Sequence, residues 1–190
     1  MRLMRLSLMF LLLSPVALPA LAQTAADDAV PTIPADQAAP VPAFSPYAFL
    51  ATAAAANAFE IEAAKLAVQK AGDAEVKGFA QQMMADHEKA QADMFAAAKA
   101  DKIEIAEPSM DGEQDGMIGK LEATSGADFD SLYIGTQLAA HQRAVALFQG
   151  YQGSDTELRR FANATLPVLV AHHDKVKALA ERLKVPAVAQ

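Results

Sequence analysis

Four long segments of the chain carry apolar residues at alternating spacings of four and three, which is the repeat of one face of an α-helix. Alanine, leucine, methionine, glutamate, glutamine and lysine dominate these segments, and all of them favour helix. Tryptophan is absent and glycine is scarce. The sequence therefore predicts an all-α protein with four main helices.

Capping residues set the bounds of the first pair of expected helices. Ser45 is a suitable N-cap, with Pro46 in the first helical position, and Gly72 is suited to follow the end of the helix. Asp73 is then the N-cap of a second helix that should run to about Asp101. The two helices are expected to form a tight hairpin.

A second hairpin is expected nearer the C-terminus. Its first helix opens with Ser125-Gly-Ala-Asp128, a weak acidic capping box, and its second with Ser154-Asp-Thr-Glu157, a full capping box. The last helix should end near Lys184. Pro167 lies inside it and should remove one backbone hydrogen bond and bend the helix.

Residues 102–124 form a polar connection between the hairpins, with a short helix expected near 113–123. A connection of this length can travel back along the bundle, as in ferritin-like folds, or it can loop outward. We favour the first arrangement and expect a ferritin-like four-helix bundle over residues 45–185.

The N-terminal region has the features of a secretory signal. Arg2 and Arg5 precede an apolar run, Leu6 to Leu13, and Ala20-Leu21-Ala22 is a small-residue cleavage site. We expect residues 1–22 to be removed after Ala22, giving a periplasmic or secreted protein. The alternative, an uncleaved membrane anchor, is disfavoured because the apolar run is shorter than the ~20 residues of a membrane span.

Composition limits the chemistry and the partners of the mature chain. Residues 23–44 contain four prolines among alanine and acidic residues, which is typical of a disordered linker. Cysteine is absent, so disulfides and thiolate chemistry are excluded. After signal cleavage 14 basic residues face 23 acidic ones, which argues against nucleic acid and anionic membranes as partners. The mature chain should have no membrane span, and a protein of the cell envelope is one possible partner.

Each expected helix carries one polar residue on its buried face. These are Glu60 among alanines, His87, His141 with Gln137 one turn before it, and His172. Asp86 lies at the edge of the same face as His87, and His173 points to a flank. Glu60, His87, His141 and His172 are therefore the candidate metal ligands, because imidazole and carboxylate groups on facing helices hold transition metals in bundles.

Two hypotheses account for these inward residues. Counting from the turn near residue 152 places His141 and His172 roughly 13 Å apart along the bundle, too far to share an ion unless Pro167 shifts the register. The same counting places His172 level with Tyr133, and His141 level with Thr165, as hydrogen-bonded pairs. We therefore expect core hydrogen bonding and predict no cofactor. The alternative is one mononuclear transition-metal site, because the Glu-x-x-His pairs of di-iron bundles are missing.

Several segments in order resemble domain-of-unknown-function family 4142. They are Glu75-Val-Lys-Gly-Phe-Ala-Gln-Gln-Met83 with Asp86-His87, then Gly126-Ala-Asp-Phe-Asp130 with Tyr133, Gln137 and His141, then Phe161-Ala-Asn-Ala-Thr-Leu-Pro167 with His172. The similarity covers about residues 47 to 182. It implies a ferritin-like helical bundle of the bacterial envelope, and it implies no activity or catalytic residue.

From these observations we expect an exported, non-enzymatic helical bundle of the bacterial cell envelope. No nucleophile–base set and no glycine-rich phosphate loop is present in the sequence. The alternative function is that of a metal-binding, ferritin-like protein with its His/Glu site inside the bundle.

Overall fold

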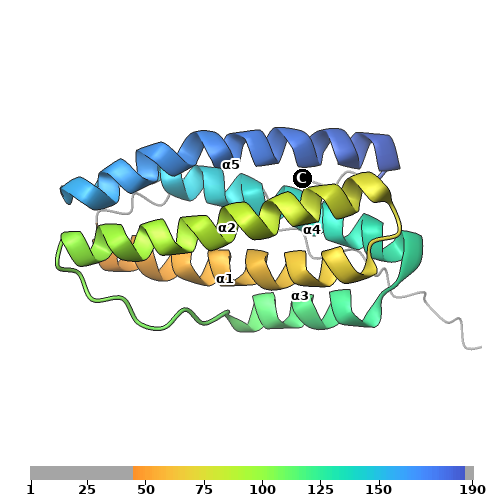
Figure 1. Cartoon of the computed structure of the whole chain (residues 1–190), viewed down its shortest axis with the longest axis horizontal. Coiled ribbons are helices and arrows are strands. Elements are labelled where there is room, and N and C mark those ends of the chain that lie inside the picture. The colour runs from red at the N-terminus through yellow and green to blue at the C-terminus, as the bar shows by residue number, and fades with distance from the viewer. Residues whose placement is uncertain (1–44, 187–190) are drawn as a thin grey trace, which may run out of the picture.

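The computed structural model describes residues 45–186, which contain five α-helices and no strand. The expected signal segment and linker lie outside the described residues. The helices are α1 (Pro46–Lys70), α2 (Ala74–Ala100), α3 (Gly112–Ala123), α4 (Gly126–Gly150) and α5 (Thr156–Leu183) (Figure 1). The predicted all-α bundle is confirmed, with the short helix of the connection as a fifth element.

The first hairpin begins and ends where its capping residues predict. The Ser45 side chain accepts a hydrogen bond from the backbone N–H of Ala48, and Pro46 opens α1. The Asp73 carboxylate accepts from the first-turn N–H groups of Glu75 and Val76 in α2. Only three residues, 71–73, separate the two helices, so they must pack antiparallel.

The capping predicted for the second hairpin is wrong in detail. Ser125 is the N-cap of α4 but forms no side-chain cap, and Gly126 follows it with φ of +63°. The N-cap of α5 is Asp155, not Ser154, and it also forms no side-chain cap. Asp101, at the end of α2, takes over this role because its carboxylate accepts from the N–H of Leu158 at 2.8 Å.

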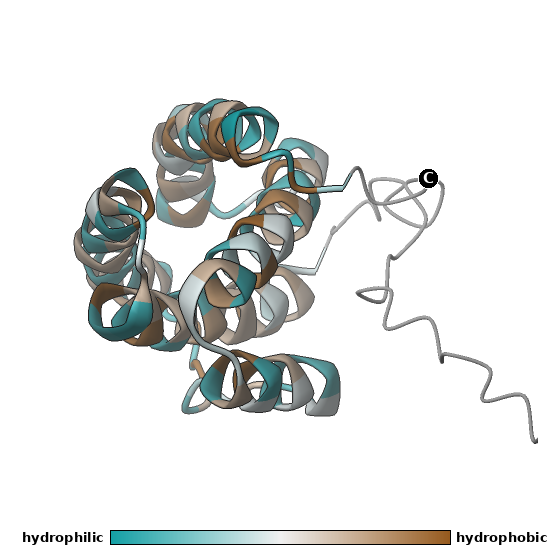
Figure 2. Cartoon of the chain, turned by 90° about the vertical axis from the view of Figure 1, so that its right-hand side faces the viewer, coloured by the Kyte–Doolittle hydropathy of each residue, from teal (hydrophilic) through white to brown (hydrophobic). Residues whose placement is uncertain are grey.

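Four long helices form a ring in which α1 and α5 each pack against both α2 and α4. Figure 2 looks along this ring and shows α3 outside it, where α3 contacts α1 and α4. At one end Asp130, near the start of α4, binds the α1–α2 turn, and at the other end α2 meets the start of α5. Because α2 ends and α4 begins at opposite ends of the bundle, residues 101–125 travel back along it. This is the crossover we expected.

Residues 151–155 displace α5 along the bundle axis. The flanking cap residues Tyr151 and Asp155 are both extended, with ψ of 118° and 124°. A segment of five extended residues covers up to about 16 Å, and in Figure 1 the start of α5 reaches well beyond the end of α4. The helix continues through Pro167 to Leu183, and its ribbon changes direction along its length. The missing backbone hydrogen bond at a proline permits such a bend.

The apolar core is divided into two clusters. One surrounds Phe79, Phe129 and Tyr133 near the α1–α2 turn, and the other surrounds Phe49, Met94 and Phe161 near the opposite end. Between them lies a layer of buried polar side chains: Asn57, Glu60, His87, Gln137, His141 and His172. We call these six residues the polar layer.

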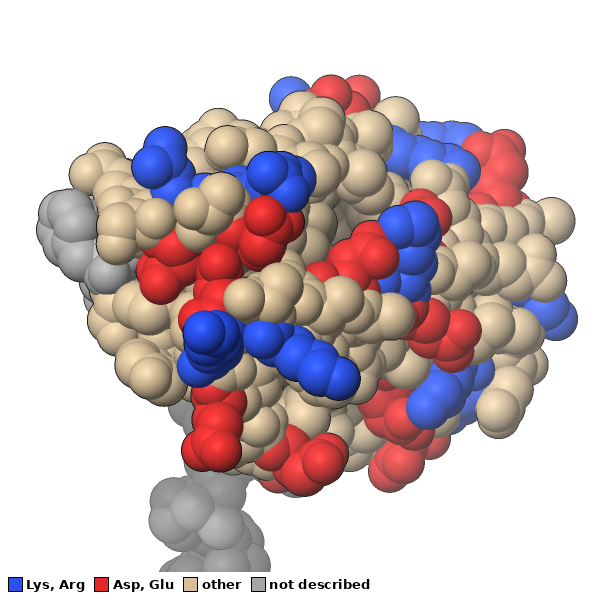
Figure 3. Space-filling view, turned by 60° about the vertical axis from the view of Figure 1, so that its left-hand side comes forward, with Lys and Arg blue, Asp and Glu red and all other residues tan. Residues whose placement is uncertain are grey.

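Among residues 45–186, no helix is both long enough and apolar enough to cross a membrane. Basic and acidic side chains are interspersed on the face drawn in Figure 3, and neither sign gathers there into a single patch.

Candidate metal centre in the polar layer

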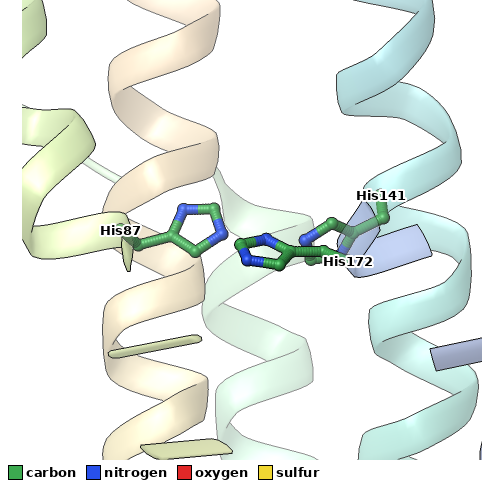
Figure 4. A group of neighbouring side chains, drawn as sticks. All are labelled: His87, His141 and His172. Atoms are coloured by element: carbon green, nitrogen blue, oxygen red, sulfur yellow. The ribbon is translucent and has the colours of Figure 1, made fainter. Parts of the chain in front are cut away.

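Three histidines from three helices meet in the polar layer. Their rings point toward one another (Figure 4), with centroids 5.7 Å apart for His87–His141, 5.7 Å for His87–His172 and 5.4 Å for His141–His172. One ring nitrogen from each histidine lies within 4.8 Å of the other two. All three side chains are buried.

Each imidazole is oriented by an acceptor on its outer side. His87 Nδ1 lies 2.8 Å from the Asn57 side-chain oxygen, and Asn57 also donates to the His87 carbonyl. His141 Nδ1 lies 3.0 Å from the backbone oxygen of Gln137. His172 Nε2 lies 2.9 Å from a carboxylate oxygen of Asp86. The backbone and carboxylate oxygens can only accept, so these ring nitrogens must donate, and the Asn57 geometry favours the same for His87.

The outer hydrogen bonds leave a lone pair on the opposite nitrogen of each neutral ring. Those nitrogens are His87 Nε2, His141 Nε2 and His172 Nδ1, and each is buried without a hydrogen-bond partner. A metal-binding histidine has this pattern, in which an outer acceptor fixes the tautomer and the other nitrogen coordinates. The polar layer therefore presents three nitrogen lone pairs that nothing else in the described chain engages.

Burial keeps the histidines neutral. Desolvation, with the neighbouring His141 and His172, holds the pKa of His87 well below its usual range. Burial lowers the pKa of His141 to about 4, although the Gln137 carbonyl opposes this shift. Burial also lowers the pKa of His172, although its bond to Asp86 works in the other direction. Neutral imidazole is the form that binds metals.

Glu60 lies beside the three histidines and outside the group of converging atoms. Its Oε2 accepts from the Gln137 side chain at 2.5 Å, and its Oε1 is 3.9 Å from the outer nitrogen of His141. Burial raises the pKa of this carboxyl to about 7, against the lowering effects of the Gln137 bond and His172. Of the four candidate ligands, the structure thus brings three together and places the fourth alongside.

The expected distance between His141 and His172 is wrong. The expected distance assumed that the two helices begin at the same level, at the turn near residue 152. In the structure, residues 151–155 separate the end of α4 from the start of α5 along the bundle axis. The contact of Asp101 with Leu158 shows the true register. His87 lies fourteen residues before Asp101 and His172 fourteen residues after Leu158, so both reach the same level.

The expected core pairs are wrong for the same reason. The Tyr133 hydroxyl is buried without a hydrogen-bond partner, and His172 binds Asp86 instead. His141 bonds to the Gln137 carbonyl rather than to Thr165. His173 lies on the flank of α5 as predicted, with its Nδ1 3.8 Å from Asp174 and its side chain 30% exposed.

Asn57 is a site residue that the sequence reasoning missed. It is buried on α1 and orients His87. Its position three residues before Glu60 and four after Ala53 was the available signal, because residues at these spacings share a helix face. Alanine at most neighbouring positions concealed it.

A cavity of about 550 Å³ reaches the polar layer from the α1–α4 side of the bundle. Glu60, His87 and His141 line its inner end, together with Asn57. Most of the wall consists of small or apolar side chains of α1 and α4: Ala53, Ala55, Ala56, Ala139, Ala140, Ala144, Leu147 and Phe148. The candidate metal centre is therefore accessible from one side.

This arrangement suits one ion with nitrogen ligands. The only carboxylates that contact the three histidines at short range are Glu60 and Asp86 within the described residues, and Asp86 already binds an outer nitrogen. A di-iron centre needs several bridging and terminal carboxylates, so the residues present do not fit one. Three imidazoles with an open side match the ligand count of mononuclear sites that keep a position for another ligand.

The chain matches the model of the family described as domain of unknown function (DUF4142) over residues 31–179. It therefore belongs to this family, as the sequence segments around Asp86-His87 and Pro167 indicated. No curated protein and no solved structure matches the chain.

Proposed function

We propose that this protein binds one divalent transition-metal ion through His87, His141 and His172. The observation that carries the proposal is the convergence of three buried ring nitrogens without hydrogen-bond partners, one from each histidine. Our first expectation, a set of core hydrogen bonds, required partners that these nitrogens do not have.

The energetics of burial favour an ion in this position. A buried polar atom without a partner costs about 1–3 kcal/mol, and here three such atoms face one another. An ion between them accepts all three lone pairs, so none of these nitrogens has to be protonated. The nitrogens lie within 4.8 Å of one another, and a tetrahedral ion with bonds of about 2.1 Å needs them about 3.4 Å apart. Rotations of the imidazole rings toward the ion would have to supply the difference.

The ligand set favours ions that accept imidazole, such as Zn²⁺, Cu²⁺ or Fe²⁺, over Mg²⁺ and Ca²⁺, which prefer oxygen. The test is thermal unfolding of the mature, metal-stripped protein with and without Zn²⁺. An ion at a hundred times its dissociation constant stabilises the folded state by about 2.7 kcal/mol. For a chain of this size the melting temperature should rise by about 5–10 °C.

His173→Ala is the control variant, because it removes the one other histidine of the chain. This variant should keep the full Zn²⁺-dependent shift. On the same background, His87→Ala or His141→Ala should abolish it. The metal site is contradicted if Zn²⁺ still raises the melting temperature after His87→Ala and after His141→Ala. It is also contradicted if Zn²⁺ does not raise the melting temperature of the His173→Ala control.

We further propose that the protein is exported and acts in the bacterial cell envelope. This rests on the N-terminal pattern of Arg2 and Arg5, the apolar run and Ala20-Leu21-Ala22. A metal-free, structural role for the bundle in the envelope is the competing function. The Zn²⁺ titration separates the two, because a structural role requires no ion.

A further inference from the structure

The cavity beside the three histidines opens between α1 and α4 and extends to buried side chains of the polar layer. The α1–α4 contact is formed largely by alanines, which leave space between the two helices. Protein interiors normally contain few voids larger than a water molecule. A void of about 550 Å³ falls within the range of small-molecule pockets, about 300–1,000 Å³.

The cavity has distinct inner and outer ends. Of its lining residues, His87, His141 and Glu60 are buried and mark its inner end, whereas Asp111 and Glu113 are exposed and mark its outer end. Asp111, Glu113 and Arg143 stand among the residues of its wall, and Arg143 is paired with Glu113 at 3.2 Å. Because this arginine is paired, the histidine end is where a ligand's head group would find its main interaction.

The polar layer determines the charge of that head group. Three neutral imidazoles supply no negative charge to a bound ion, and the Asp86 carboxylate lies on the far side of His172, where it binds the outer nitrogen. Glu60 is held by Gln137 and lies beside the converging nitrogens rather than among them. An anion that reaches the ion from the cavity would therefore be attracted strongly in a site of low dielectric constant.

We infer that the cavity binds a small aliphatic carboxylate, with its head group on the open side of the metal ion and its chain among the alanines of α1 and α4. This inference rests on the proposed metal site. Each methylene placed in the cavity should tighten binding about fourfold, the factor that corresponds to ~0.8 kcal/mol per buried CH₂.

The experiment uses the mature protein loaded with Co²⁺, whose visible absorption reports the ligands of the ion. Acetate, hexanoate and octanoate are titrated in turn, with hexanol as a neutral probe. Carboxylates should change the spectrum, and octanoate should bind at least tenfold more tightly than acetate. Hexanol should leave the spectrum unchanged. A spectrum that no carboxylate alters, or affinities independent of chain length, overturns the inference.

Variants test whether the chain of the ligand occupies the cavity. Ala144→Leu fills part of it and should weaken octanoate binding at least tenfold while acetate and Co²⁺ affinities stay within about threefold. Ala92→Leu, at an exposed position of α2 away from the cavity, is the matched control. If the Ala144→Leu variant does not fold, Ala56→Leu fills the cavity from α1 and replaces it in the experiment. Equal octanoate binding by cavity and control variants overturns the placement.

Failure of the metal site is recognised separately. A protein that takes up no Co²⁺ overturns the proposed function and this inference with it, whereas Co²⁺ uptake without a carboxylate response overturns the inference alone. If Glu60 itself occupied the open position, Glu60→Gln would change the Co²⁺ spectrum and carboxylates would not.

Discussion

The three imidazoles differ in the acceptors that orient them. Asn57 offers a side-chain amide oxygen, Gln137 a backbone carbonyl, and Asp86 a carboxylate. A carboxylate acceptor raises the basicity of its histidine more than a neutral acceptor does, because it stabilises positive charge on the ring. His172 should therefore be the strongest of the three in donating its electron pair to a metal ion.

Asp86→Ala should weaken Zn²⁺ binding about 10–100-fold, the usual cost of losing such an outer partner. Competition with a chromophoric chelator measures the affinity. Asp93→Ala is the matched control, because Asp93 lies on the same helix but pairs with Lys89 at the surface. Equal affinities for the two variants would show that the Asp86 bond does not support the ion.

The pKa shifts of the polar layer predict how the stability of the metal-free protein depends on pH. The pKa of His141 is about 4 in the folded chain and about 6.5 when unfolded, and the pKa values of His87 and His172 are lowered too. Between these values the unfolded chain binds more protons, so stability should fall as the pH drops below about 6.5.

Glu60 acts in the opposite sense. Its folded pKa of about 7 lies above the unfolded value, so its contribution to stability is lost as the pH rises through 7. The three histidines outweigh it over the whole range, so Glu60 makes the rise of stability with pH shallower but does not reverse it. Urea unfolding with chelator between about pH 5 and 7 measures this slope. Glu60→Gln should make the slope steeper, and an unchanged slope would show that Glu60 does not titrate in this range.

At the scale of the helices, the register of α5 depends on a contact between distant segments. The Asp101 carboxylate caps α5 through the N–H of Leu158, and Tyr151 stacks on Phe49 of α1 with ring centroids 4.2 Å apart. Asp155, the formal N-cap, instead accepts from the Tyr151 hydroxyl at 3.2 Å. The local sequence therefore misidentifies the group that caps this helix.

Asp101→Ala should lower the free energy of unfolding by about 1 kcal/mol, the typical cost of a lost N-cap. Ser154→Ala should change it by less than about 0.5 kcal/mol, because Ser154 is exposed and caps nothing. Urea denaturation of both variants tests the assignment. If Ser154→Ala lowered the free energy of unfolding more than Asp101→Ala, Ser154 would be the cap, as the sequence predicts.

Helix positions and inward faces were predictable because both depend on local rules. Ser45, Asp73 and the three- and four-residue spacings are read within a few turns of chain. The meeting of His141 with His172 was not predictable in this way, because it depends on how far residues 151–155 advance along the axis. That advance is set by Asp101 and Phe49, which lie more than fifty residues away in the sequence.

In the whole molecule, the two hairpins are joined at both ends by polar contacts. At the turn end, Asp130 of α4 accepts from the N–H groups of Gly72 and Asp73 at 3.1 and 2.8 Å. Arg182 of α5 donates to the Asp73 carboxylate at the same end. These contacts fix the hairpins against each other and keep the polar layer in register.

Asp130→Ala should lower the free energy of unfolding by about 2–3 kcal/mol, because it leaves two partly buried N–H groups without their charged acceptor. Asp128→Ala, at an exposed position two residues earlier in the same helix, should cost only a few tenths of a kcal/mol. Chemical denaturation compares them. Similar values for both variants would mean that the hairpins dock without this contact.

The export proposal predicts the form of the protein in the cell. Mass spectrometry of the natural protein should find Gln23 as the first residue, in the soluble periplasmic fraction, because Ala20-Leu21-Ala22 fits a cleavage site. A chain that retains Met1 and sediments with membranes would contradict both cleavage and the periplasmic location.

The order of the three histidines along the chain has a consequence for where an ion is acquired. His87 belongs to the first hairpin, whereas His141 and His172 belong to the second. Neither half of the chain holds the full set, and the set closes only when the last helix has docked. For a protein threaded across a membrane from its N-terminus, the ion would be drawn from the compartment that receives the chain. The metal supply of that compartment, as much as the affinity of the histidines, would decide which element the protein carries.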